Sequence, residues 1–578
     1  MPLSLLRRAI DIFLAQHHGV EFCSFLHQPS LAAETVGTEH PFLCRSIIAL
    51  SALDMCDSEA QTYGYSSLEV LSEHFADLAR ASARTTIDQP SIPSIQANLV
   101  LAMYELLTRD GIKAWMFSGV ATRQAQALRL GVELHSKHSA REKETRRRVF
   151  WACFIMDRLV AYTCSRPQMI GLESVRLQLP CPDRLFAFGD DYNGPNLNTV
   201  MSHIHQIVSI GLMPFFICIL SLWSEIVYLQ MRDGRRGALH PPSDPNGPFS
   251  RLEIQVEEFQ AALPLKAQWS PENYRAYNSM GQGKLFIYLH LLLNHARFAL
   301  HQEYLPQQDG PVLIMVDGDN NNANDTEMDG AGLSLNYTDD RIISVCLSGA
   351  SAIAEIVSFI WNAEDGTSRE PLRSVVAVHP IMAAAAVQMW AQYTRQQGPE
   401  HDDTATTPQT AYKDNVILFA TVIQSWKPRW KIAYAFDETL DSVQRLYESS
   451  YLTSPWDNND ASFGGVADDE DLPGGETNST PCVHSGNTVE GGGGGAAILV
   501  VTGDGNANAT PEVAEGSGLP DPEQVCQRLF DKIRYTMLVS LEAPDVKRRM
   551  LNVYLRTLWI HVWKSTTTTG EDFVDWEQ

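Results

Sequence analysis

Apolar residues recur at spacings of three and four along most of this chain, which is the period of an amphipathic helix. In one stretch they fall at Ile95, Leu99, Met103 and Leu106. No run alternates apolar and polar residues as a half-buried strand would. The sequence therefore predicts an all-α, multi-helix fold. The other helical patterns cover residues 41–55, 114–130, 143–163, 341–360, 375–393, 412–425 and 437–447, with one or two more helices between 523 and 564.

Two long acidic segments interrupt the helical pattern. Residues 306–340 contain 8 acidic side chains and residues 455–525 contain 13, and neither segment has a Lys or Arg. Such compositions bury too little apolar surface to offset the entropy lost on ordering, so they predict long disordered acidic inserts. The predicted organisation is a helical domain at 1–305, a disordered acidic insert at 306–340, a helical continuation at 341–454, an acidic linker at 455–522, and C-terminal helices with an acidic-aromatic tail at 523–578.

The charge balance limits the partners of the chain. Its formal net charge is −25, and phosphate contacts supply most of the affinity of nucleic-acid binders, so a free-standing nucleic-acid-binding protein is disfavoured. One basic run, Arg146 to Arg148, opens a predicted helix just after Glu144. This run either contacts phosphate or forms a solvated, salt-bridged helix face, and the second interpretation is favoured.

Catalytic and metal-binding signatures are absent from the sequence. The ten cysteines include no C-x-x-C pair, so no zinc site is predicted. The histidine pairs His17-His18 and His203-x-His205 have no third ligand nearby, and the run from Asp317 lacks the glycine and glutamate of a calcium loop. No nucleophile elbow or phosphate-binding loop occurs. We therefore expect no catalytic residue, no metal ligand and no enzymatic activity.

The most apolar stretch, residues 207–223, carries no formal charge. It lies at the short limit for a membrane span and contains Pro214 and two serines. A buried core helix is favoured over a membrane segment, and no contact with a membrane is expected.

The segment from Glu144 to Asp183 carries the most specific motif. Arg147 and Arg148 lead into Phe150-Trp151 on a predicted helix, Asp157-Arg158 follows two turns later, and an Arg166-Pro167 break precedes an extended exit through residues 179–182. Other fragments occur in order along the first 300 residues: a predicted opening helix at 5–26, then 40–43, 48–52, 94–97, 103–105 and 114–130. The ordered set resembles the regulatory domain of fungal zinc-cluster (Zn(II)2Cys6-type) transcription factors, also called the xylanolytic transcriptional activator regulatory domain. Ser165 stands where this family usually has glycine.

This resemblance implies a nuclear regulator of RNA polymerase II transcription that contacts coactivators or the transcription machinery, with a homo- or heterodimer partner. The DNA-binding part of the family is a six-cysteine cluster holding two zinc ions, and these residues contain no counterpart. Zinc and DNA are therefore implied only through a cluster upstream of these residues or through a partner. The alternative is a stand-alone helical interaction protein that dimerises with, or titrates, an intact transcription factor.

Two sets of residues are candidates for functional roles. The charged residues Arg148, Asp157, Arg158 and Arg166 are interpreted as ion pairs that fix helix register, with a small-molecule or partner pocket as the alternative. The motif residues that are given a structural role are Arg147, Arg148, Trp151, Asp157, Arg158, Arg166 and Pro167. Isolated aromatics among acidic residues are typical of activation segments, which gives Phe463, Phe573 and Trp576 as the second set, with an ordinary acidic tail as the alternative.

Overall fold

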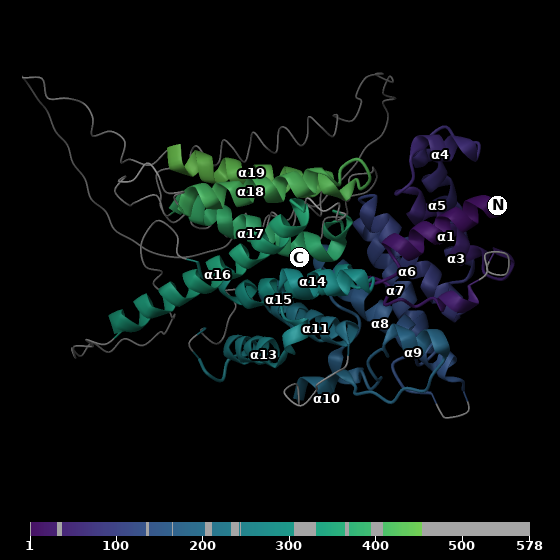
Figure 1. The fold of residues 1–578 in the computed structure, drawn as a ribbon, viewed down its shortest axis with the longest axis horizontal. Coiled ribbons are helices and arrows are strands. Elements are labelled where there is room, and N and C mark those ends of the chain that lie inside the picture. The colour runs from purple at the N-terminus through teal and green to yellow at the C-terminus, as the bar shows by residue number, and fades with distance from the viewer. Residues whose placement is uncertain are drawn as a thin grey trace, which may run out of the picture. The chain divides into compact units, whose positions relative to one another are not determined.

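The structure is a computed structural model of the chain (Figure 1). It describes residues 2–31, 37–134, 138–164, 166–202, 211–232, 242, 244–305, 331–363, 369–394 and 408–452. All of these residues belong to one compact unit, so the predicted boundaries at 305 and 341 both fall inside it. Within the described ranges every regular element is helical, and the single β-type pairing is an isolated bridge between Gln178 and Asn196. The all-α prediction is confirmed.

The first helices form a layered bundle in which α3 packs on α1, α5 and α6, and α6 packs on α7. Side-chain caps fix where several of these helices begin: Ser67, Ser91 and Asp110 each accept a hydrogen bond from a backbone N–H of the first turn. The elements are α1 (Leu3–Gln16), η1 (Gln28–Ser30), α3 (Pro41–Ala52), α4 (Asp57–Thr62), α5 (Leu68–Thr85), α6 (Ile92–Leu107) and α7 (Gly111–Ala127).

The middle of the chain is organised around two long helices. α8 packs against α6, α7 and α11, and α15 packs against α11, α13, α14, α16 and α17. The elements here are α8 (Ala140–Thr163), η2 (Leu172–Ser174), α9 (Asp183–Phe188), α10 (Leu197–Ser202), α11 (Leu212–Arg232), α13 (Pro248–Ala262), η4 (Leu265–Ala267), α14 (Pro271–Ser279) and α15 (Gly283–Gln302).

The last described helices continue the same unit. Figure 1 shows α17, α18 and α19 lying side by side, and all three pairs are in contact. The long helix α16 packs on α15 and α17. The elements are α16 (Ala331–Trp361), η5 (Glu370–Leu372), α17 (Val375–Thr394), α18 (Pro408–Gln424) and α19 (Ile432–Leu452).

Two of the differences between the observed and the predicted helix bounds are large. The opening helix ends at Gln16 instead of continuing to residue 26, and further along this stretch Cys23 and Ser24 adopt left-handed backbone conformations, with φ of 51° and 47°, that a continuous helix excludes. Helix α16 begins at Ala331, inside the segment predicted to be a disordered insert. The alanine and leucines after residue 330 favour helix, which explains the earlier start.

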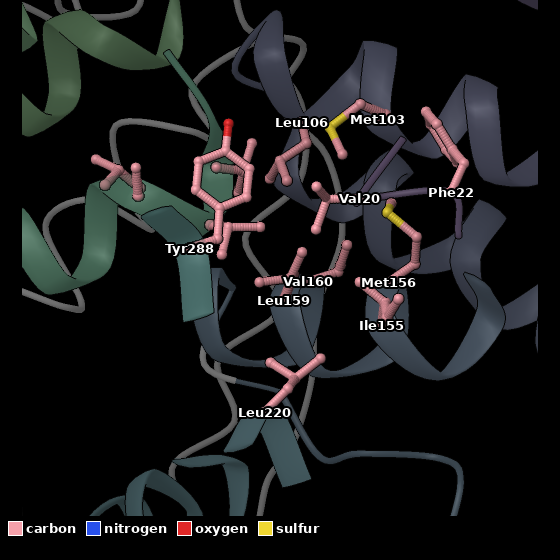
Figure 2. Packing of buried hydrophobic residues seen from close by; sticks show 14 of the residues in the cluster. Val20, Phe22, Met103, Leu106, Ile155, Met156, Leu159, Val160, Leu220 and Tyr288 are labelled. Atoms are coloured by element: carbon pink, nitrogen blue, oxygen red, sulfur yellow. The ribbon is translucent and has the colours of Figure 1, made fainter. Parts of the chain in front are cut away.

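Buried apolar side chains from distant parts of the chain meet beside α8. Figure 2 shows Leu159 and Val160 of α8 between Leu106 of α6, Leu220 of α11 and Tyr288 of α15, all of them buried. Burial of such side chains contributes roughly 1.5–3 kcal/mol each. Helix α8 therefore packs between the earlier helix α6 and the later helices α11 and α15.

Three described helices are long and apolar enough, by length and composition, to cross a membrane. They are Leu212–Gln230, Asp340–Trp361 and Val375–Tyr393, and 78%, 44% and 78% of their most apolar windows are buried inside the protein. The apolar stretch predicted as a core helix corresponds to α11, which begins at Leu212.

Gly349 of α16 lies where this helix approaches α15 most closely. A Cβ added at Gly349 would lie 2.7 Å from Phe298 Cδ1 and 3.2 Å from the Asn294 carbonyl oxygen. Because Phe298 is fully buried and cannot move aside, Gly349→Val should lower the free energy of unfolding by about 2 kcal/mol. Urea unfolding followed by circular dichroism measures this loss. Ser348→Val, at an exposed position of the same turn, is the matched control, and equal effects of the two substitutions would contradict the close approach.

The C-terminal predictions lie outside the described residues. These include the linker at 455–522, the C-terminal helices and tail at 523–578, and the aromatic residues Phe463, Phe573 and Trp576.

Candidate functional site

The motif residues are arranged along α8, which begins at the N-cap Ser139. Glu144 lies three and four positions before Arg147 and Arg148, a spacing that places the three side chains on one face of the helix. Asp157 and Arg158 follow on the later turns. All five side chains are buried, with 4% or less of each exposed.

The first cluster is centred on Arg148. Its Nε donates to Glu144 Oε1 at 2.9 Å, its Nη1 donates to Asp183 Oδ1 at 2.7 Å, and its Nη2 donates to the Cys181 carbonyl oxygen at 2.8 Å. The Cys181 N–H donates in turn to Glu144 Oε1 at 2.9 Å. The extended segment that leaves the motif is thereby held against α8 at both its carbonyl and its amide.

Arg147 and Trp151 hold the same segment at Gln178, three residues before Cys181. Arg147 pairs with Glu144 and with Glu133, whose Oε1 accepts the Gln178 backbone N–H at 3.0 Å. Trp151 Nε1 donates to the Gln178 carbonyl oxygen at 2.8 Å. Both backbone groups of Gln178 are therefore satisfied by side chains, so this non-helical segment can be buried without an unpaired amide or carbonyl.

The second cluster holds the loop that contains the Arg-Pro break. Asp157 accepts the backbone N–H groups of Met169 and Ile170 at 3.0–3.1 Å. Arg158 donates to Asp157 Oδ2 at 2.7 Å and to the Ile170 carbonyl oxygen at 2.6 Å, and its guanidinium lies 3.8 Å from the centre of the Phe154 ring. The pair thus closes the loop onto the end of α8.

Arg166 and Pro167 lie in this loop. The guanidinium of Arg166 is 5.8 Å from the centre of the Trp115 ring on α7. Pro167 is exposed and follows the end of α8, where a residue that cannot extend a helix is expected.

Burial and pairing act in opposite directions on these arginines. Burial lowers the pKa of Arg158 to about 10, and the neighbouring Asp157 carboxylate opposes that shift. For Arg148, burial also lowers the pKa, but the charges of Asp183 and Glu144 outweigh it and the pKa is raised. Both guanidinium groups are therefore cationic at neutral pH and are neutralised within the fold.

The prediction of a solvated face for Arg146 to Arg148 is wrong for two of the three residues. Arg147 and Arg148 are buried, because the segment at 178–183 lies against the face of α8 that carries Glu144 and bonds to it. Arg146 is half-buried, and its Nη2 donates to the Leu128 carbonyl oxygen at 2.9 Å. This leaves no row of three exposed guanidinium groups for phosphate.

A third ion-pair centre, at Asp54, was not predicted from the sequence. Its carboxylate contacts His17 at 2.7 Å, Arg373 at 2.7 Å and Arg429 at 3.2 Å. Burial by itself raises the pKa of Asp54, but the His17 hydrogen bond and the arginine charges outweigh it and lower the pKa to about 2. This centre connects the first helices to the last ones. Because the two arginines lie more than 300 residues from Asp54 in the sequence, no local pattern predicts these pairs.

Of the two histidine pairs, only His17-His18 lies within the described residues. His17 pairs with Asp54, while His18 Nε2 accepts the Leu26 backbone N–H at 2.8 Å, so the two rings serve separate contacts. His203 and His205, like the run from Asp317, lie outside the described residues. In the described part of the chain no group of three or more His, Cys, Asp or Glu side chains is placed to hold a metal ion.

One pocket borders the motif, and another lies elsewhere in the described part of the chain. A pocket of about 170 Å³ is bordered by Arg148, Asp183 and Lys284. A larger pocket of about 590 Å³ lies between α13, α15 and α16, and no residue of the motif lines it.

Residues 10–244 match the model of the fungal specific transcription factor domain. Over those residues the chain is similar to this family, in agreement with the resemblance carried by the motif at 144–183.

Relatives extend the similarity beyond this domain. An uncharacterised transcriptional regulatory protein of Schizosaccharomyces pombe is 25% identical over 401 residues, covering 62% of this chain and 40% of the relative. A second one from the same yeast is 28% identical over 309 residues, covering 49% of this chain and 44% of the relative. A Zn(2)-C6 fungal-type transcription factor of Fusarium oxysporum f. sp. lycopersici is 25% identical over 305 residues, covering 49% of this chain and 32% of the relative. The chain therefore spans less than half the length of these curated relatives.

Proposed function

We propose that this chain regulates transcription by RNA polymerase II and that its helical unit is the regulatory region of a zinc-cluster factor. The observation that carries the proposal is the fungal specific transcription factor domain at residues 10–244. Relatives named as transcriptional regulators, which match as much as 62% of the chain, support it. The proposal includes a nuclear location and contact with coactivators, and it assigns the chain no enzymatic activity and no membrane contact.

Access to DNA depends, in this proposal, on residues that the printed sequence does not contain. The sequence has ten cysteines and no C-x-x-C pair, so the two zinc ions and the DNA contacts belong to a cluster outside these residues or to a dimer partner. The chain itself then contributes regulation and recruitment.

The charged motif is assigned a positioning role. The Glu144–Arg148 and Asp157–Arg158 pairs are buried and each holds backbone groups of a non-helical segment, which supports a role in fixing register over a role in binding.

Tethering tests the regulatory function directly. The full chain fused to a foreign DNA-binding domain should change reporter transcription several-fold relative to that domain alone. Replacing Phe463, Phe573 and Trp576 together by alanine should remove most of an activating effect, because apolar side chains of activation segments dock into coactivator grooves. Phe188→Ala, at an aromatic residue of the helical unit that is 76% exposed, is the matched control.

Three outcomes of the tethering experiment bear on the proposal. Activation that survives the triple alanine substitution would contradict the assignment of the tail residues. A fusion that leaves the reporter unchanged would contradict recruitment by this chain. If the untethered chain then lowered the activity of an intact zinc-cluster factor, the alternative of a titrating interaction protein would replace the proposal.

A further inference from the structure

The pocket of about 590 Å³ has the size of a small-molecule site and is built by residues that follow the family domain. One continuous face of α15 forms its floor, carrying His290, Leu293, Arg297 and His301 at helical spacing. Helix α13 forms one wall and α16 the other. The residues of the floor are buried except for Arg297, whereas rim residues such as Glu257 and Gln260 are exposed.

The walls of the pocket are mostly apolar. Val256, Leu263, Leu293 and Leu300 line it, and each is 4% exposed or less. Val345 of α16 and the half-buried Trp269 complete the lining. Such walls bind the hydrocarbon body of a ligand.

The acidic groups of the pocket are already neutralised. Glu253 contacts His301 Nε2 at 3.1 Å and Arg341 at 2.9 Å, and Arg341 also reaches Glu257 at 3.5 Å. Burial by itself raises the pKa of Glu253, but the bond from His301 and the charge of Arg341 outweigh it and lower the pKa. A cationic ligand therefore finds no unpaired carboxylate here.

Arg297, in contrast to these carboxylates, has no partner of opposite charge among the described residues. Among the described residues its one hydrogen bond goes to the neutral amide oxygen of Asn294, at 3.4 Å, and no carboxylate lies within 4.0 Å of it. One turn further along α15, His301 is 97% buried, and its Nδ1 has no hydrogen-bond partner in the described part of the chain. Because buried polar atoms are almost always satisfied, a half-buried cation beside an unpaired nitrogen indicates a missing polar partner.

We propose that this pocket binds a small carboxylic acid with an apolar body. The carboxylate pairs with the guanidinium of Arg297, whose planar fork matches its two oxygens. A polar group one helical turn away bonds His301 Nδ1, and the hydrocarbon part packs on Val256, Leu293 and Leu300. The binding itself does not depend on the proposed role in transcription.

Three probes that differ only in the head group test the proposal: phenylbutyrate, phenylbutanol and phenylbutylamine. Calorimetric titration of the full chain should show phenylbutyrate binding at least about tenfold more tightly than the alcohol, with no binding of the amine. Arg297→Gln should remove the preference for the acid and leave the weak binding of the alcohol. Arg341→Gln, which removes the exposed arginine paired with Glu253 and Glu257, should retain the preference.

A second variant separates pocket binding from surface binding. Ala352 lines the pocket from α16 and is half-buried, so Ala352→Trp should fill the space and abolish binding of all three probes. Thermal unfolding of each variant verifies that it is folded. Equal affinities for the acid and the alcohol, an Arg297→Gln variant with unchanged preference, or no binding of the acid at millimolar concentration would overturn the proposal.

Discussion

Acidification from pH 7 to pH 5 should remove several kcal/mol from the free energy of unfolding of the helical unit. Four buried histidines are the reason: burial lowers the pKa of His290 to about 4, and those of His18, His295 and His379 to about 3, from an ordinary value of 6.5. Two of them accept hydrogen bonds that protonation would break: Leu26 N–H donates to His18 Nε2, and Trp223 Nε1 donates to His295 Nδ1.

The sign of the pH dependence follows from whether the folded or the unfolded state binds more protons. Below about pH 6.5 the unfolded chain protonates these histidines, whereas the folded chain keeps them neutral until about pH 4 or lower. Stability is therefore fully present above pH 6.5 and is lost as the pH falls. In that range each histidine lowers the free energy of unfolding by about 1.4 kcal/mol per pH unit. Over two pH units the combined loss from four histidines is comparable with the whole free energy of unfolding of a typical domain.

Urea unfolding at a series of pH values measures this slope. His290→Gln should reduce the slope between pH 6 and pH 4.5 by about one proton. His138→Gln, at an exposed histidine paired with Glu142, is the control and should leave the slope unchanged. A wild-type slope below one proton over this interval would show that the buried histidines do not govern the acid response.

Asp157→Ala should lower the free energy of unfolding by about 3–5 kcal/mol, the largest effect that we expect from a single substitution. The change leaves Arg158, which is 1% exposed, as a buried charge without its carboxylate. It also removes the acceptor of the Met169 and Ile170 backbone N–H groups, so the loop after α8 loses its attachment.

Two further variants make the test of this ion pair specific. Asp183→Asn changes a carboxylate that also pairs with a buried arginine but is itself 61% exposed, so it should cost less than about 1 kcal/mol. The double variant Asp157→Leu with Arg158→Met removes both charges and should recover much of the loss, because an apolar pair of similar volume fits a buried site. Equal losses for Asp157→Ala and Asp183→Asn, measured by urea unfolding, would contradict the assigned burial.

The local features of the chain could be predicted because they depend on residues close together in the sequence. The period of three to four between apolar residues is a property of a single helix, so the helices over residues 41–55, 95–108 and 143–163 were predicted to within a few residues. The spacing of Glu144 from Arg147 and Arg148 likewise places their side chains together on any helix.

The sequence did not predict features that depend on contacts with residues far away in the chain. The burial of Arg147 and Arg148 depends on the segment at 178–183, which lies against α8. Nothing near Asp54 in the sequence points to Arg373 or Arg429.

The residue pattern alone established that the chain is all-α and that a charged motif lies on one helix, and this motif resembles that of fungal transcription factor regulatory domains. The tertiary structure alone decided which charges are neutralised and which are not. It pairs Arg148 and Arg158 inside the fold, and among the residues that the structure describes it leaves Arg297 without a carboxylate partner in a pocket between α13, α15 and α16. The physical reason is that helix periodicity acts over four residues, whereas an ion pair depends on where separately folded helices bring their side chains within a few ångströms of one another.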